Sequence, residues 1–132
     1  MNLLDTGRRS ENIERRSIEG SEYSMKRMIW ISYDLGIRGD YEGMYAWLDD
    51  HEAVECGDSF ALVKYDVKKD LMKELKADLS ETLSLQKRTR IYVIHLDSQT
   101  KKMKGTFLFG GRKAAPWSGY AGGKGEEDEV EV

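Results

Sequence analysis

The chain has 132 residues, of which 39% are hydrophobic and 34% charged, and its net charge is −3. This composition is typical of one globular domain that buries its own core, and no apolar run approaches the roughly 20 residues of a membrane-spanning helix. The N-terminus has no signal-peptide pattern and Cys56 is the single cysteine, so we expect a cytoplasmic protein without an internal disulfide.

Charge is distributed unevenly along the chain. Residues 40–58 carry seven acidic groups and no basic ones, whereas residues 86–113 carry eight basic groups against Asp97 alone. Residues 126–132 add five more acids. This separation of charge predicts a basic face that binds phosphates and an acidic face elsewhere. The plainer interpretation is that both are solvated surfaces of a small domain.

The chain divides into three predicted regions. A polar arm covers residues 1–25, a folded domain covers 26–110, and a flexible tail, first glycine-rich and then acidic, covers 111–132. The folded domain opens with a run over 28–35 that is apolar on both faces apart from Ser32, which predicts a central strand.

The folded region alternates strands and helices. After a glycine-bearing turn over 36–39, Asp40 is a suitable N-cap for a helix over 41–51, whose apolar stripe consists of Tyr41, Met44, Tyr45 and Leu48. Two short strands over 53–56 and 59–65 flank a Gly57-Asp58 hairpin turn. Leucines at spacing four predict a helix over 68–83, and two strands follow over 90–97 and 103–109.

This order, β-α-β-β-α-β with an additional C-terminal strand, predicts a ferredoxin-like α+β fold. Right-handed crossovers place both helices on one face of an antiparallel sheet. The first and third strands should then be central in that sheet.

Basic residues provide the main functional lead. Lys87, Arg88 and Arg90 precede or open the fourth strand, and three further lysines surround the turn over 98–102, namely Lys101, Lys102 and Lys104. At opposite ends of one strand they would form a nucleic-acid-binding stripe with little sequence specificity. We expect Tyr92 and Trp117 to pack in the core, with base stacking as the alternative role.

Other catalytic patterns are incomplete. His51 and His95 lie in different elements without the four ligands that zinc requires, so we expect structural roles for both. Cys56 is predicted to be a small core residue. The serines lack a nucleophile elbow, and the glycines of 110–125 do not form a phosphate loop.

Several short motifs together resemble a known family. They are the strand end Tyr33-Asp34, Asp40-Tyr41 at a helix start, the Gly57-Asp58 turn and the strand over 90–94. Over about 28–97 the chain resembles the second Cas protein of CRISPR adaptation, the protein that partners the integrase. The resemblance is closest to the SinR-like branch of that family, which is related in fold to the VapD toxins. It implies a ferredoxin-like homodimer on which an extra strand packs, here 103–109. The arm before Met25 and the tail after Pro116 have no counterpart in that family.

The resemblance also implies a role for Asp34, which matches the acidic residue that closes the family's first strand. Two copies of Asp34 would face each other across a dimer axis and share Mg²⁺, making Asp34 both metal ligand and catalytic residue. Asp40 and Asp58 are co-ligands if their loops converge. Capping of a turn or helix is the alternative role for such aspartates.

Two functional hypotheses follow. The first is a small dimeric nucleic-acid-associated protein acting on DNA or RNA, for which Mg²⁺-dependent endonuclease activity is an open question. The second is a non-catalytic interaction or regulatory module in bacterial or phage defence, which engages a protein partner through the acidic 40–58 face. Neither hypothesis involves a membrane.

Overall fold

The computed structural model describes residues 24–122. The predicted N-terminal arm up to residue 23 and the acidic end over 123–132 lie outside the described residues. Among the residues described, no helix is long and apolar enough to cross a membrane.

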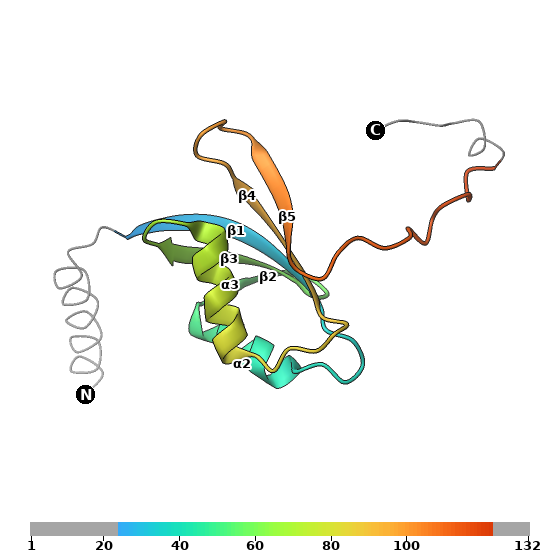
Figure 1. The fold of residues 1–132 in the computed structure, drawn as a ribbon, viewed down its shortest axis with the longest axis horizontal. Coiled ribbons are helices and arrows are strands. Elements are labelled where there is room, and N and C mark those ends of the chain that lie inside the picture. The colour runs from blue at the N-terminus through green and yellow to red at the C-terminus, as the bar shows by residue number, and fades with distance from the viewer. Residues whose placement is uncertain (1–23, 123–132) are drawn as a thin grey trace.

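The fold is α+β, with one five-stranded antiparallel sheet and two helices (Figure 1). Along the sheet the strand order is β2-β3-β1-β4-β5. The elements in chain order are β1 (Met25–Asp34), α2 (Tyr41–Asp50), β2 (Val54–Gly57), β3 (Phe60–Val67), α3 (Leu71–Thr82), β4 (Arg90–Leu96) and β5 (Met103–Phe109).

The first strand is the middle strand of the sheet, as predicted. β1 pairs with β3 on one side and β4 on the other, and β3 lies between β1 and β2. The predicted start at residue 28 is wrong, because the pairing with β3 continues down to Met25 opposite Val67. This extension places polar Lys26 and Arg27 in the strand, where an apolar-run criterion cannot find them.

The α2 stripe was predicted only in part. Met44 and Leu48 are buried, but Tyr45 is 56% exposed and Trp47 takes the third buried position. Residues 44, 47 and 48 follow the i, i+3, i+4 spacing of one helix face, and Tyr45 lies off it. Asp40 caps the helix as predicted, accepting a hydrogen bond from Gly43 N at 2.9 Å.

The α3 helix begins at Leu71 rather than at residue 68. Asp70 caps it by accepting from Lys73 N at 3.2 Å. The Glu74 side chain turns back to accept three backbone N–H groups, those of residues 68, 69 and 70, at 2.7–2.8 Å. The segment before Leu71 is therefore held by its own helix in a bend at residues 68 and 69, although its lysines are good helix formers.

The predicted hairpin is confirmed, although its turn is at Asp58 and Ser59 because Gly57 still pairs with Phe60. The prediction that Cys56 packs in the core is wrong. Cys56 is exposed, because β2 is a four-residue edge strand whose first three residues all face solvent. Its apolar neighbour Val54 is likewise 57% exposed.

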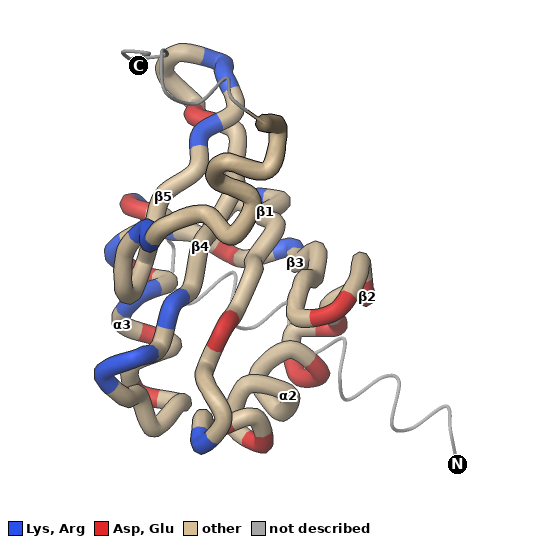
Figure 2. The backbone as a smooth tube through the Cα atoms, turned by 90° about the vertical axis from the view of Figure 1, so that its right-hand side faces the viewer, with Lys and Arg blue, Asp and Glu red and all other residues tan. Residues whose placement is uncertain are grey.

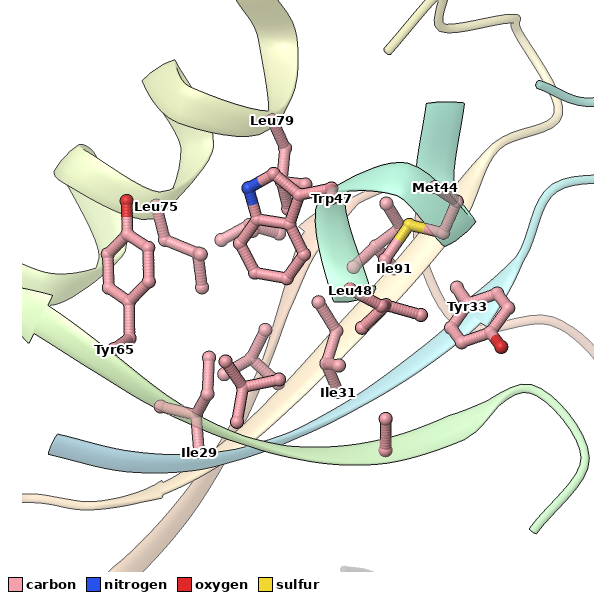
Figure 3. Close-up of a cluster of buried hydrophobic side chains, with 14 of the residues drawn as sticks. Ile29, Ile31, Tyr33, Met44, Trp47, Leu48, Tyr65, Leu75, Leu79 and Ile91 are labelled. Atoms are coloured by element: carbon pink, nitrogen blue, oxygen red, sulfur yellow. The ribbon is translucent and has the colours of Figure 1, made fainter. Parts of the chain in front are cut away.

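One hydrophobic core lies between the helices and one face of the sheet (Figure 3). Alternate side chains of β1, β3 and β4 supply its sheet side, in keeping with the two-residue period of a strand. The fully buried members include Ile29, Ile31, Met44, Val63, Leu75, Leu79, Ile91 and Val93.

Asp78 of α3 connects both helices to the sheet. One of its oxygens, Oδ2, accepts a hydrogen bond from Tyr65 Oη at 2.8 Å and another from Trp47 Nε1 at 3.2 Å. The ring of His51 lies nearby, with its Nε2 3.9 Å from the same oxygen. Burial and the hydrogen bond to Asp78 raise the pKa of Tyr65, so its hydroxyl stays a donor at neutral pH.

We expect Asp78→Ala to lower the free energy of unfolding by about 1–3 kcal/mol, because two partly buried donors lose their shared acceptor. Urea unfolding measures this difference. The matched control is Asp66→Ala, which removes a pair with Lys26 between side chains that are 52% and 64% exposed. That loss should cost at most about 1 kcal/mol, and equal costs for the two variants would contradict this role of Asp78.

The opposite side of the sheet, called the open face below, carries the alternate side chains. Its exposed apolar residues include Met28, Leu96 and Met103, at 45%, 48% and 55% exposure. At its centre, half-buried Trp30 lies opposite Leu62 of β3 and Ile94 of β4. The buried side chains of α2 and α3 belong to the core cluster on the other side, so neither helix covers this apolar centre.

Candidate nucleic-acid interface

Asp34 ends β1 at the rim of the open face. Its side chain is 52% exposed, and in the sheet register it lies opposite Arg90, the first residue of β4. Asp34 Oδ2 is 3.7 Å from Arg90 Nε, which is an ion pair rather than a hydrogen bond. Arg90 Nη1 donates to the carbonyl of Gly111 at 3.1 Å. The guanidinium is thus held between the end of β1 and the segment after β5.

Beside this ion pair is a hollow of about 230 Å³, called the aromatic hollow below. Its lining residues are Ser32, Asp34, Arg90, Tyr92, Phe107 and Arg112. The guanidinium of Arg112 lies 5.5 Å from the ring centre of Phe107 and 5.9 Å from that of Tyr92. Cation–π attraction of this kind restrains the arginine without neutralising its charge.

A second hollow, of about 410 Å³, adjoins the first and is called the basic hollow below. The two hollows share Asp34 and Arg90. The residues that line the basic hollow are Asp34, Gly36, Lys87, Arg88, Thr89, Arg90, Gly110, Gly111 and Lys113. They come from three separate stretches of the chain: the end of β1, the α3–β4 connection and the segment after β5.

Local hydrogen bonds fix the α3–β4 connection. Thr89 N donates to Gln86 O at 3.1 Å and Gln86 N donates to Thr89 Oγ1 at 3.0 Å, which closes a turn over 86–89. Ser84 N donates to Asp40 Oδ2 at 2.9 Å and ties the same connection to the start of α2. With Thr89 buried as the anchor, the turn presents Lys87 and Arg88 to solvent.

The segment after β5 reaches the same place because of Gly110. This residue has φ +78°, and a Cβ atom there would lie 2.7 Å from the carbonyl oxygen of Thr89. Glycine alone allows this close approach together with a left-handed backbone. Arg112 and Lys113 are consequently brought to the hollows.

The structure gathers only half of the predicted binding residues. Lys87, Arg88 and Arg90 line the basic hollow, whereas Lys101, Lys102 and Lys104 lie around the β4–β5 turn, about 20 Å away along a seven-residue strand. The prediction that the two groups occupy opposite ends of β4 is confirmed.

Arg112 and Lys113 were not predicted as site residues, although the order of the strands in the sequence indicates their position. Because β5 runs antiparallel to β4, the residues that follow β5 must return to the start of β4. Figure 2 shows the result, with basic residues along the α3–β4 connection and after β5, and acidic residues on α2 and β2.

The aromatic candidates do not pack in the core. Tyr92 lies half-buried at the aromatic hollow, in edge contact with Phe107 at 4.7 Å between ring centres. Trp117 is 73% exposed. The prediction of core packing is therefore wrong for Trp117, and Tyr92 faces the open side of the sheet.

A metal site at Asp34 has no support from one copy of the chain. Over residues 24–122, no group of three His, Cys, Asp or Glu side chains is placed to hold a metal ion. Both oxygens of Asp40 accept backbone hydrogen bonds, from Ser84 and Gly43, which hold the pKa of Asp40 below its usual value. Asp40 is thus a cap, and Mg²⁺ at Asp34 stays a prediction that needs further ligands from outside this chain.

A comparison with protein-family models, curated proteins and solved structures finds no match for this chain. The resemblance to the CRISPR-adaptation family therefore stays a prediction from short motifs.

Proposed function

We propose that this protein is a small nucleic-acid-associated protein that contacts phosphates through the basic and aromatic hollows. One observation carries the proposal: five cationic side chains from separate parts of the chain surround one carboxylate. They are Lys87, Arg88, Arg90, Arg112 and Lys113, and the carboxylate is that of Asp34. Arginine and lysine clusters of this kind bind phosphate backbones.

A ferredoxin-like topology is part of the proposal. The antiparallel sheet with β1 between β3 and β4, and β2 at the outer side of β3, supports it. In this arrangement both helices cover one face, and β5 extends the sheet beyond β4. The open face is then available on the other side.

A homodimer is the proposed functional unit. The centre of the open face is apolar around Trp30, Leu62 and Ile94, and exposed Met28 and Leu96 enlarge this area. An apolar patch is complementary to itself across a two-fold axis, whereas a charged patch is not. Two copies paired in this way would bring two sets of hollows into one assembly and double the basic surface.

A fluorescence-anisotropy titration tests the nucleic-acid proposal. The full chain is titrated against short single- and double-stranded DNA and RNA at two salt concentrations, with and without Mg²⁺. Five cationic side chains make at most five phosphate contacts, so log K should fall against log salt with a slope no steeper than about −3.5 to −4.5. Absence of binding at low salt would refute the proposal. The alternative function would then be the binding of a protein partner through the acidic surface of α2 and β2.

A further inference from the structure

The basic hollow has more positive charge than its surroundings neutralise. Four cationic side chains line it, against the single carboxylate of Asp34, which pairs with Arg90. Over residues 24–122, the side chains of Lys87, Arg88 and Lys113 make no hydrogen bond or ion pair, and all three are exposed. Three cations therefore converge on one hollow without an internal partner.

The three cations reach the hollow from different directions. Lys87 and Arg88 come from the turn before β4, and Lys113 comes from the segment after β5. Cations that converge around a concave site differ in what they bind from cations in a row along a surface. A row of cations contacts successive phosphodiesters, each with one negative charge, whereas cations around a concave site favour a single group that carries more negative charge.

A terminal phosphate is such a group. Near neutral pH it carries between one and two negative charges, since its second pKa is about 6, and it presents three strong acceptor oxygens. A phosphodiester within a strand has a single charge and two free oxygens. The number of unpaired cations in the basic hollow thus matches the acceptor oxygens of a strand end better than those of a strand interior.

The remaining wall of the hollow leaves room for this group. Gly36, Gly110 and Gly111 have no side chains, and a Cβ atom placed at Gly111 would meet nothing within 4 Å. A volume of about 410 Å³ is within the range of small-molecule sites and accommodates a phosphate with its sugar. The adjoining aromatic hollow, with Arg112 held over Phe107, provides a path for the next nucleotide.

We propose that the basic hollow binds the terminal phosphate of a nucleic-acid strand, through Lys87, Arg88 and Lys113. The inference rests on the proposed function and adds to it the part of the nucleic acid that is recognised. Asp34 repels the phosphate but holds Arg90 in place beside it.

The test uses the full chain and three oligonucleotides of one sequence, carrying a 5′-phosphate, a 3′-phosphate or no terminal phosphate. We expect one phosphorylated end to bind about tenfold more tightly than the unphosphorylated strand. The two phosphorylated arms identify which end is recognised. Inorganic phosphate should compete with that oligonucleotide at lower concentration than it competes with the unphosphorylated one.

Matched variants separate end recognition from the extra charge of a phosphate. Arg88→Gln/Lys113→Gln should remove the preference for the phosphorylated end. Lys101→Gln/Lys102→Gln, which removes the same charge at the other end of β4, should weaken all three oligonucleotides alike and keep the preference. Neither pair is buried, so circular dichroism should show unchanged folding.

The outcomes distinguish this inference from the proposed function. Equal affinity for all three oligonucleotides, or a preference that survives in the Arg88/Lys113 variant, would overturn end recognition and leave general nucleic-acid binding intact. Failure of every oligonucleotide to bind would overturn both.

Discussion

Trp30→Lys is expected to turn the proposed dimer into a monomer. Trp30 lies at the centre of the open face on the middle strand, opposite Leu62 and Ile94. A lysine there would place a charge in the middle of an apolar interface, where central aromatic residues contribute at least about 2 kcal/mol to binding. The dimer should weaken by about 30-fold or more, as measured by sedimentation velocity over a concentration series.

The control for this variant is Ile37→Lys. Ile37 is 99% exposed in the turn after β1, so the same change of residue type occurs outside the proposed interface. It should leave the association unchanged. A wild-type protein that stays monomeric at the highest concentration tested would contradict the homodimer.

Asp34→Asn is expected to tighten nucleic-acid binding in the absence of Mg²⁺. The substitution removes the only carboxylate that residues 24–122 contribute to a site lined by five cations, and it keeps the size of the side chain. Loss of one nearby negative charge should raise the affinity about three- to tenfold at low salt, with a smaller gain at high salt. Fluorescence anisotropy on a single oligonucleotide measures the change.

Asp50→Asn is the matched control, because Asp50 is an exposed aspartate at the end of α2 and lines neither hollow. It should alter the affinity little. Weaker binding of the Asp34 variant without Mg²⁺ would contradict the charge argument. Cleavage that requires Mg²⁺ in the wild type and disappears in Asp34→Asn, but not in Asp50→Asn, would instead support the metal site implied by the family resemblance.

Much of the fold was predictable because its signals are local. The leucines of α3 recur at spacing four, and all four, from Leu71 to Leu83, are buried. The Gly57-Asp58 pair predicts the hairpin to within one residue, since the turn is at Asp58 and Ser59. The strand over 103–109 begins and ends as predicted. In each case, neighbouring residues are enough to define the element.

Predictions failed where particular contacts decide, two of them tertiary and one local to the start of α3. The beginning of β1 depends on the length of β3, and the beginning of α3 depends on Glu74 binding the backbone before the helix. Burial of Trp47 in place of Tyr45 depends on where Asp78 lies on the other helix. None of these partners is adjacent in the sequence.

The candidate site was predictable in its charge but not in its shape. A count of basic residues treats Lys87 and Lys101 alike, although they lie at opposite ends of β4. Two contacts give the site its form: the close approach of Gly110 to Thr89, and the carbonyl of Gly111 that accepts from Arg90. Both depend on the pairing of β4 with β5.

The most direct test of the central claim is the salt dependence of nucleic-acid binding in the wild type and in Lys87→Gln/Arg88→Gln/Lys113→Gln. If these three side chains contact phosphates, the slope of log K against log salt should become less steep, by about one unit if they share one terminal phosphate and by about two to three units if they contact separate phosphates. An unchanged slope, with wild-type affinity at every salt concentration, would show that nucleic acid binds elsewhere and would contradict the assignment of the basic hollow.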